Sequence, residues 1–238
     1  MSAKKLLIIF LLSVAFFVSG KLHAQRFIGS LSAGMNLAQV DGDEEYGFKK
    51  VGWNIGPAIT IPFGKSRKWS VTVELLFSQI GSKQKSQYLN DTVIDSTQVR
   101  YYDGYKLNLT YVQIPVLIHF TDKKSVAGGI GFLYGQLVDV KEWEDHNDER
   151  GTFRTSTDLS GPYSKYDLQV IADVRIRLWK RLWINGRYGY SIIPIRTREF
   201  QNPFVLTDTW TRKQYNNVIT FRLSYFFNEE VPLKKPKN

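Results

Sequence analysis

The chain holds few of the residues that usually carry out chemistry. It has no cysteine, which excludes disulfides, thiolate metal sites and cysteine nucleophiles together. Of its three histidines, His23 lies in a segment that we expect to be removed, His119 ends a predicted strand, and His146 lies in an acidic loop. Neither of the last two stands beside a serine at strand-end spacing, so the nucleophile–base pair of acyl transfer has no evident candidate. We therefore predict that the protein is not an enzyme and that His119 is a rim residue.

The acidic loop at 142–149 is the stretch that comes nearest to a cation site. Asp145, Asn147 and Glu149 alternate as the first ligands of a calcium loop do. However, Gly151 comes one place late, and a serine replaces the terminal glutamate of such loops. These mismatches favour a solvated loop, and we predict no metal and no other cofactor.

The first 24 residues have the order of a secretory signal peptide. Lys4 and Lys5 precede a thirteen-residue apolar run at 6–18, and Ala24 closes the segment. The run is too short to span a membrane as a helix, although a short membrane anchor is the alternative. Cleavage leaves 214 residues, a plausible size for a single barrel domain.

The net charge of +10 falls to +7 when the three lysines of the signal peptide leave. An excess of basic over acidic residues can indicate nucleic-acid binding. Here the basic residues sit in turns such as 64–68 and 179–181, with no recognisable nucleic-acid module. An exported chain also rarely meets a genome, so we predict no nucleic-acid partner.

The stretch at 50–81 sets the pattern of the remaining chain. Apolar side chains occupy the odd positions of 51–63, while small or polar side chains occupy the even ones. After a basic turn at 64–68, the alternation restarts at Trp69. Because successive side chains of a strand point to opposite faces, this is an antiparallel pair with one apolar face. Each strand is long enough to cross a bilayer at a tilt, which takes about 9–11 residues.

The same alternation predicts eight strands, at 26–40, 51–63, 69–78, 105–120, 126–140, 166–178, 182–192 and 215–227. Short connections alternate with long polar loops at 41–49, 81–104, 141–162 and 195–212. Aromatic residues gather at the short-turn end as an interfacial girdle: Trp69, Trp179, Trp183, Tyr225 and Phe227. We predict an all-β fold, an eight-stranded antiparallel transmembrane β-barrel of the cell outer membrane, at 25–227. Its short turns are periplasmic, its long loops extracellular, and 228–238 form a periplasmic tail.

A soluble lipocalin-like barrel is the structural alternative, because it also has eight alternating strands. Its outward face would carry many lysines and glutamates. Here the non-apolar face is mostly Gly, Ala, Ser, Thr and Asn, which suits a narrow, crowded interior. Such an interior is just wide enough for its own side chains, which argues against a diffusion channel.

One predicted strand, at 105–120, changes the parity of its apolar positions. Leu107, Leu109 and Tyr111 are odd-numbered, whereas Val112, Ile114, Val116, Ile118 and Phe120 are even-numbered. A one-residue bulge near Tyr111 or Val112 would restore a single apolar face. Pro115 fits a disturbed ladder close by.

Four charged residues are predicted to face the barrel interior at one height. Glu74, Asp173, Arg187 and Arg222 each lie five or six residues from the short-turn end, on the non-apolar face of a strand. Bare charges would be costly in a narrow lumen, whereas a neutral layer of two acids and two bases can be tolerated. The alternative is a water-filled lumen in which each charge is solvated independently.

Five stretches carry a family resemblance: GMNLAQVDG at 34–42, VELLFSQIG at 73–81, NLTYVQIPV at 108–116, YDL at 166–168 and RYGY at 187–190. Together they resemble the PorT-like outer-membrane β-barrel family over nearly the whole mature chain. The motifs are structural. The resemblance implies an outer-membrane barrel, and the namesake of the family is implicated in the type nine secretion system.

Two hypotheses for function follow. In the first, the protein is a non-enzymatic barrel that partners proteins of a secretion or envelope-assembly complex within the outer-membrane lipid. In the second, its long loops bind an external ligand or host molecule.

Overall fold

The computed structural model describes residues 27–43, 47–94, 97–122, 125–148, 151–157, 159, 161–201 and 209–229. Within these residues no helix is long and apolar enough to cross a membrane. The strands are β1 (Ile28–Asp41), β2 (Lys50–Phe63), β3 (Trp69–Glu74), β4 (Leu76–Ile94), β5 (Thr97–Asp122), β6 (Val126–Asp148), β7 (Gly151–Thr157), β8 (Tyr166–Trp179), β9 (Leu182–Ser191), β10 (Arg196–Gln201) and β11 (Thr209–Phe226).

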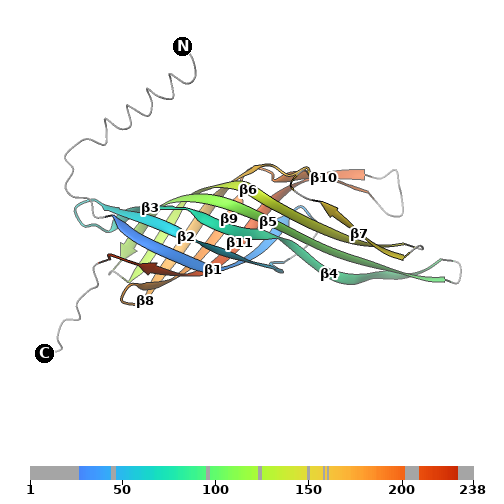
Figure 1. Cartoon of the computed structure of the whole chain (residues 1–238), viewed down its shortest axis with the longest axis horizontal. Coiled ribbons are helices and arrows are strands. Elements are labelled where there is room, and N and C mark those ends of the chain that lie inside the picture. Colours follow the sequence, from blue (N-terminus) through green and yellow to red (C-terminus); the bar gives the residue numbers. More distant parts are fainter. Residues whose placement is uncertain are drawn as a thin grey trace, which may run out of the picture.

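These segments form a closed ring of eight antiparallel strands. β3 and β4 act as one strand that is interrupted at Leu75, and each strand of the ring pairs with its neighbours in sequence order. The ring closes because β1 pairs with both β2 and β11. β7 and β10 lie outside the ring, against the far ends of β6 and β11. The predicted eight-stranded barrel is confirmed, and Figure 1 shows its elongated shape.

The predicted division into an apolar outer face and a small, polar inner face also holds across the barrel wall. In β2, for example, the residues from Val51 to Ile59 at odd positions are exposed, while those at even positions from Lys50 to Thr60 are buried. A soluble barrel would hide this apolar face from water, so its exposure is what a lipid-facing surface requires.

Three of the predicted long loops contain more strand than loop. The segment 81–104 lies in a hairpin, because β4 continues to Ile94 and β5 starts at Thr97. The segment 141–162 contains the end of β6 and all of β7, and 195–212 contains β10 and the start of β11. Figure 1 shows β4, β5 and β7 projecting from one end of the barrel. The pattern missed them because a hairpin in water needs no apolar face, so the period-two signal disappears while backbone pairing continues.

The bulge predicted in the strand at 105–120 is misplaced. In β5 the odd positions point inward without interruption, from Tyr105 to His119. The register shift lies between Thr110 and Tyr111, but the extra residue belongs to the neighbouring strand β6, where Val138 has no partner. The apolar residues change sides for another reason. Leu107, Leu109 and Tyr111 fill the interior above the level at which the outer surface meets lipid.

Two prolines explain why β3 and β4 are interrupted at Leu75. Pro57 of β2 lies opposite Leu75 and accepts a hydrogen bond from its N–H at 3.0 Å, but it has no N–H to return. On the other side, the register of β5 places Pro115 at the same break, since Val116 pairs with Val73 and Gln113 with Leu76. Proline within a sheet disturbs the ladder at its own position.

The aromatic girdle at the short-turn end is confirmed in part. Trp69, Trp179, Tyr225 and Phe227 are exposed on the outer face. Trp183 is not a girdle residue, because it points inward and is only 4% exposed. Its neighbours Leu182 and Ile184 take the outward positions of β9, so alternation leaves Trp183 the inward one.

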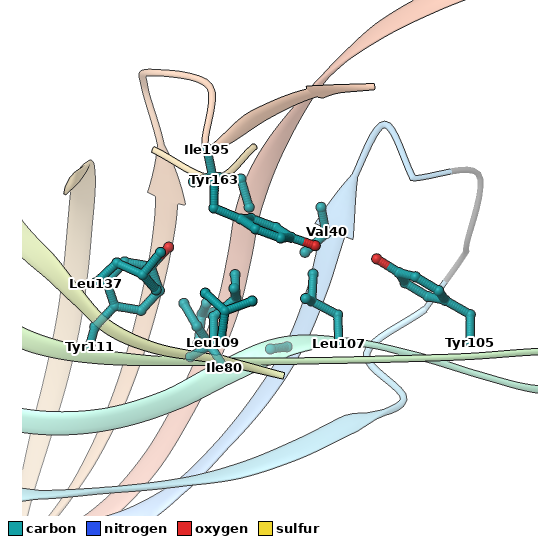
Figure 2. Packing of buried hydrophobic residues seen from close by; sticks show 12 residues of the cluster. Val40, Ile80, Tyr105, Leu107, Leu109, Tyr111, Leu137, Tyr163 and Ile195 are labelled. Atoms are coloured by element: carbon teal, nitrogen blue, oxygen red, sulfur yellow. The ribbon is translucent and has the colours of Figure 1, made fainter. Parts of the chain in front are cut away.

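The hydrophobic core sits inside the barrel near its long-hairpin end and forms what we call the apolar plug. Figure 2 shows these side chains converging from several strands, together with Tyr163 and Ile195 from the segments between strands. The plug consists of Ala38, Val40, Ile80, Tyr105, Leu107, Leu109, Tyr111, Leu137, Val140, Tyr163, Ile195 and Val218.

Candidate functional site

The four predicted interior charges lie together within the barrel. Glu74 ends β3, Asp173 lies in the middle of β8, Arg187 in β9 and Arg222 in β11, and all four are buried. Asp173 and Arg187 are direct cross-strand partners. Inward parity places each side chain in the lumen, so strands distant in sequence meet at one charged layer.

Glu74 is the acceptor at the centre of this layer. Its carboxylate receives two hydrogen bonds from Arg187, at 3.0 and 2.9 Å, and two from Arg222, at 2.8 and 3.0 Å. Arg175 donates a further bond at 3.2 Å. Paired guanidinium–carboxylate bonds are among the strongest in proteins, and they fix both distance and orientation.

Asp173 joins the layer from the opposite wall. It accepts a hydrogen bond from Arg187 at 2.9 Å and lies 3.6 Å from Arg175 and 3.7 Å from Arg222. Arg187 therefore bridges the two acids. The layer is also larger than the predicted set of four, because Arg175 brings a third guanidinium, and its five charges leave one positive charge in excess.

His119 also belongs to the layer, so its prediction as a rim residue is wrong. The side chain is 1% exposed, and its Nε2–H donates to Asp173 at 2.7 Å. The Nδ1 atom then accepts from the Thr72 hydroxyl at 3.2 Å. Its odd number in β5 gave the signal, because the lipid-facing residues around it are even-numbered.

The order Asp173, His119, Thr72 resembles that of a hydrolase triad, which sequence spacing alone did not reveal. Its surroundings do not suit catalysis. Thr72 and His119 are fully buried, and the Thr72 hydroxyl is engaged with Thr60 at 3.1 Å. A nucleophile needs an open side where the reacting carbonyl can sit. We interpret these contacts as the clamp that orients the histidine and the carboxylate.

Above the charged layer the lumen is filled by amides, small hydroxyls and the apolar side chains of Leu76, Leu133 and Ile171. Asn36 donates to Ser78 at 2.9 Å and accepts from Asn54 at 3.1 Å and from Thr220 at 2.9 Å. A cavity of about 20 Å³ lies here, lined by Arg187 among others and reaching to Ile80 and Val218 of the apolar plug. This volume holds about one water molecule, which is far from a continuous channel.

A second buried ion pair closes the long-hairpin end above the apolar plug. Arg196 donates to Glu142 at 2.8 Å, to the Tyr163 hydroxyl at 2.6 Å and to Gln214 at 2.8 Å. Figure 2 shows the hydroxyls of Tyr105 and Tyr163 pointing toward each other, and Arg196 contacts both. Burial alone would raise the pKa of Glu142, but the charge and hydrogen bonds of Arg196 outweigh it and hold that pKa below its ordinary value.

A third ion pair closes the short-turn end and fastens the start of the predicted tail. The Glu229 carboxylate accepts from Arg177 at 2.7 and 3.2 Å and from the Trp183 indole at 3.0 Å. Asn228 in turn bonds the backbone of Phe27 and Gly29 at the start of β1. The remainder of the tail, 230–238, lies outside the described residues.

The other sequence candidates give no site. Among the described residues no group of three histidine, aspartate or glutamate side chains is arranged to hold a metal ion. The side chains of the calcium-like stretch at 145–151 lie outside the part of the chain whose side chains are described.

The comparisons bear on the barrel as a whole. A family model described as outer membrane protein beta-barrel domain matches residues 23–196. The chain belongs to this family. An outer-membrane β-barrel resides in the cell outer membrane, so the predicted location is confirmed together with the fold.

Solved structures of other outer-membrane proteins are similar at low sequence identity. Ail of Yersinia pestis is 14% identical, with 84% of this chain and 98% of that chain covered at a TM-score of 0.42. Neisserial surface protein A is 8% identical, with 84% and 96% covered at a TM-score of 0.39. Comparison with curated proteins finds no match.

Proposed function

We propose that this outer-membrane barrel is not an enzyme or a pore but a membrane-embedded binding partner for other proteins of the envelope. The observation that supports this most is the filling of the lumen at three levels. These are the pair at Glu229, the charged layer around Glu74 and the apolar plug with the Arg196–Glu142 pair. Because side chains occupy the interior, the surfaces that can bind partner proteins lie at the two ends of the barrel.

The resemblance to the PorT-like family indicates which kind of envelope complex to propose. The motifs that carry it fall in the wall of the barrel, at 73–81 and 108–116, and the charged layer draws Glu74 from the first of them. We propose a role as an accessory of protein secretion through the type nine system, or of envelope assembly. The partners would be proteins of such a complex, contacted through the hairpins or the basic short turns of a barrel that sits in the outer-membrane lipid.

A second candidate function is binding of an external ligand or host molecule by the projecting hairpins. The observation that favours it is the length of the β4–β5 hairpin, in which β4 continues to Ile94. Beyond Ser78, the described pairings of β4 are with β5 alone. A strand edge of this kind offers backbone donors and acceptors to an incoming strand.

Co-purification in mild detergent separates the two functions. The protein is extracted from the outer membrane with its partners and the retained proteins are identified. Recovery of secretion or assembly components supports the first function. A barrel that comes out alone, and that binds external ligands through its hairpins, contradicts it and favours the second.

Shortening the β4–β5 hairpin tests where the contact lies. Residues 85–104 are replaced by a two-residue Asn-Gly turn, which suits antiparallel strands and here joins the cross-strand partners Gln84 and Tyr105. The ring below should fold normally, because changes at loop tips away from a buried core are tolerated. We expect partner recovery to fall to background while the folded form keeps its fast migration in unheated gels. Unchanged recovery would move the contact to the opposite end, at the basic turn 64–68.

A further inference from the structure

A group of lysines lies on the outer face of the barrel just beyond the lipid-facing band. Lys83 of β4 and Lys106 of β5 are direct cross-strand partners, and both are exposed. Lys141 of β6 lies on the same face, opposite Asn108 of β5. Three neighbouring strands thus present three ammonium groups to the same region of space.

The arrangement is unfavourable for the protein by itself. Like charges directly opposite each other destabilise an antiparallel pair. Lys50, at the start of β2, is buried on the inner side of the wall and is not part of this face. Among the described side chains, one acid lies on this face. It is Asp139, which lies 4.0 Å from Lys141. The surface therefore keeps an excess of positive charge that an anion would relieve.

The neighbouring side chains complete a surface suited to a phosphorylated headgroup. The Trp143 ring lies under Lys106, 5.1 Å from its Nζ atom to the ring centroid. Asn108 and Thr110 continue the outward face of β5 toward the membrane and offer hydrogen-bonding groups. Tryptophan beside cationic side chains is the combination found where a protein surface passes through lipid headgroups.

The height of these lysines favours a lipid over a soluble anion. Val112 of β5 is apolar and faces outward, and Asn108, the partner of Lys141, lies four residues beyond it. Lys106, the partner of Lys83, lies six residues beyond Val112. In a strand tilted by about 45°, four to six residues correspond to roughly 9–14 Å along the membrane normal. A lysine side chain can bend back by several ångströms toward the headgroups. The ammonium groups thus reach the layer in which lipid phosphates lie.

We propose that Lys83, Lys106 and Lys141, with Trp143 beside them, form a binding site for the phosphate groups of a phosphorylated glycolipid in the outer leaflet. The phosphate lies between Lys83 and Lys106 and relieves their repulsion. This site is separate from the contacts of the proposed partner function.

The test measures binding of diphosphoryl lipid A to the purified mature protein in zwitterionic micelles, by native mass spectrometry. The double variant Lys83→Gln/Lys106→Gln should bind about thirtyfold more weakly, because each lysine near a charged lipid surface contributes roughly a factor of five. The double variant should also be at least as stable as the native protein without lipid, because the like-charge pair is gone.

A matched control carries the same charge change at the other end, as Lys65→Gln/Lys68→Gln, and should bind lipid A as the native protein does. Equal losses in both variants would show unspecific attraction and overturn the site. Equal binding of a dephosphorylated lipid A would do the same. Displacement of the lipid by millimolar inorganic phosphate would indicate a soluble-anion site instead and contradict the lipid assignment.

Discussion

Glu74→Gln is expected to lower the free energy of unfolding of the barrel by about 3–5 kcal/mol, the usual cost of breaking a buried ion pair. Glu74 accepts hydrogen bonds from Arg187, Arg222 and Arg175. Without its charge, three buried guanidinium groups share the carboxylate of Asp173 alone. Arg187→Met should cost less, because Arg175 and Arg222 still face the two acids.

The measurement is the temperature at which the folded barrel loses its fast gel migration. The urea concentration at the midpoint of unfolding in micelles gives a second measure of stability. Glu199→Gln makes the same chemical change at an exposed position of β10 and should stay within about 0.5 kcal/mol of the native protein. Adding Arg222→Met to Glu74→Gln restores the original charge excess and should recover part of the loss. A Glu74→Gln variant as stable as the native protein would show that water solvates these charges independently.

Trp183→Ala is expected to cost about 3–5 kcal/mol, as truncation of a buried large aromatic residue does. Its ring lies 5.9 Å from that of Phe226 and 4.4 Å from the Arg177 guanidinium, and its indole N–H holds Glu229. The variant removes packing inside the short-turn end and one of the anchors of the chain after β11.

Two variants separate packing from hydrogen bonding at this end. Trp183→Phe keeps most of the ring and should lose about 1.5–3 kcal/mol, the range for a hydrogen bond to a charged group. Trp179→Ala removes a tryptophan that is 67% exposed on the outer face and should cost less than Trp183→Ala in the same micelles. The reverse order, with Trp179→Ala the more damaging, would contradict the inward packing of Trp183.

The parts of the fold that could be predicted from the sequence are those governed by alternation next to lipid. From Trp69 to Phe77 the outward and inward sets follow directly from residue parity, because an apolar face was required on one side. The same rule correctly placed Asp173, Arg187 and Arg222 inside. The parity of His119 and Trp183 also points inward. Both were predicted as residues of the rim or the girdle because they lie near strand ends.

Other features depend on contacts that no local pattern reports. Arg175 enters the charged layer because a long side chain can reach the level of Asp173, two residues away on the same face. The bulge at Val138 lies in β6, while the parity change that suggested it lies in β5. The long hairpins stand in water, where neither face must be apolar and alternation carries no signal.

The most direct test of the central claim, that side chains close the lumen, is the ionic current through the native protein. The purified mature barrel is reconstituted into lipid vesicles together with a known porin and fused with a planar lipid bilayer, so that the current steps of the porin verify insertion. The filled lumen predicts a flat current under applied voltage, because an eight-stranded interior has room only for its own side chains. Reproducible current steps proportional to voltage would contradict it and would make the protein a channel.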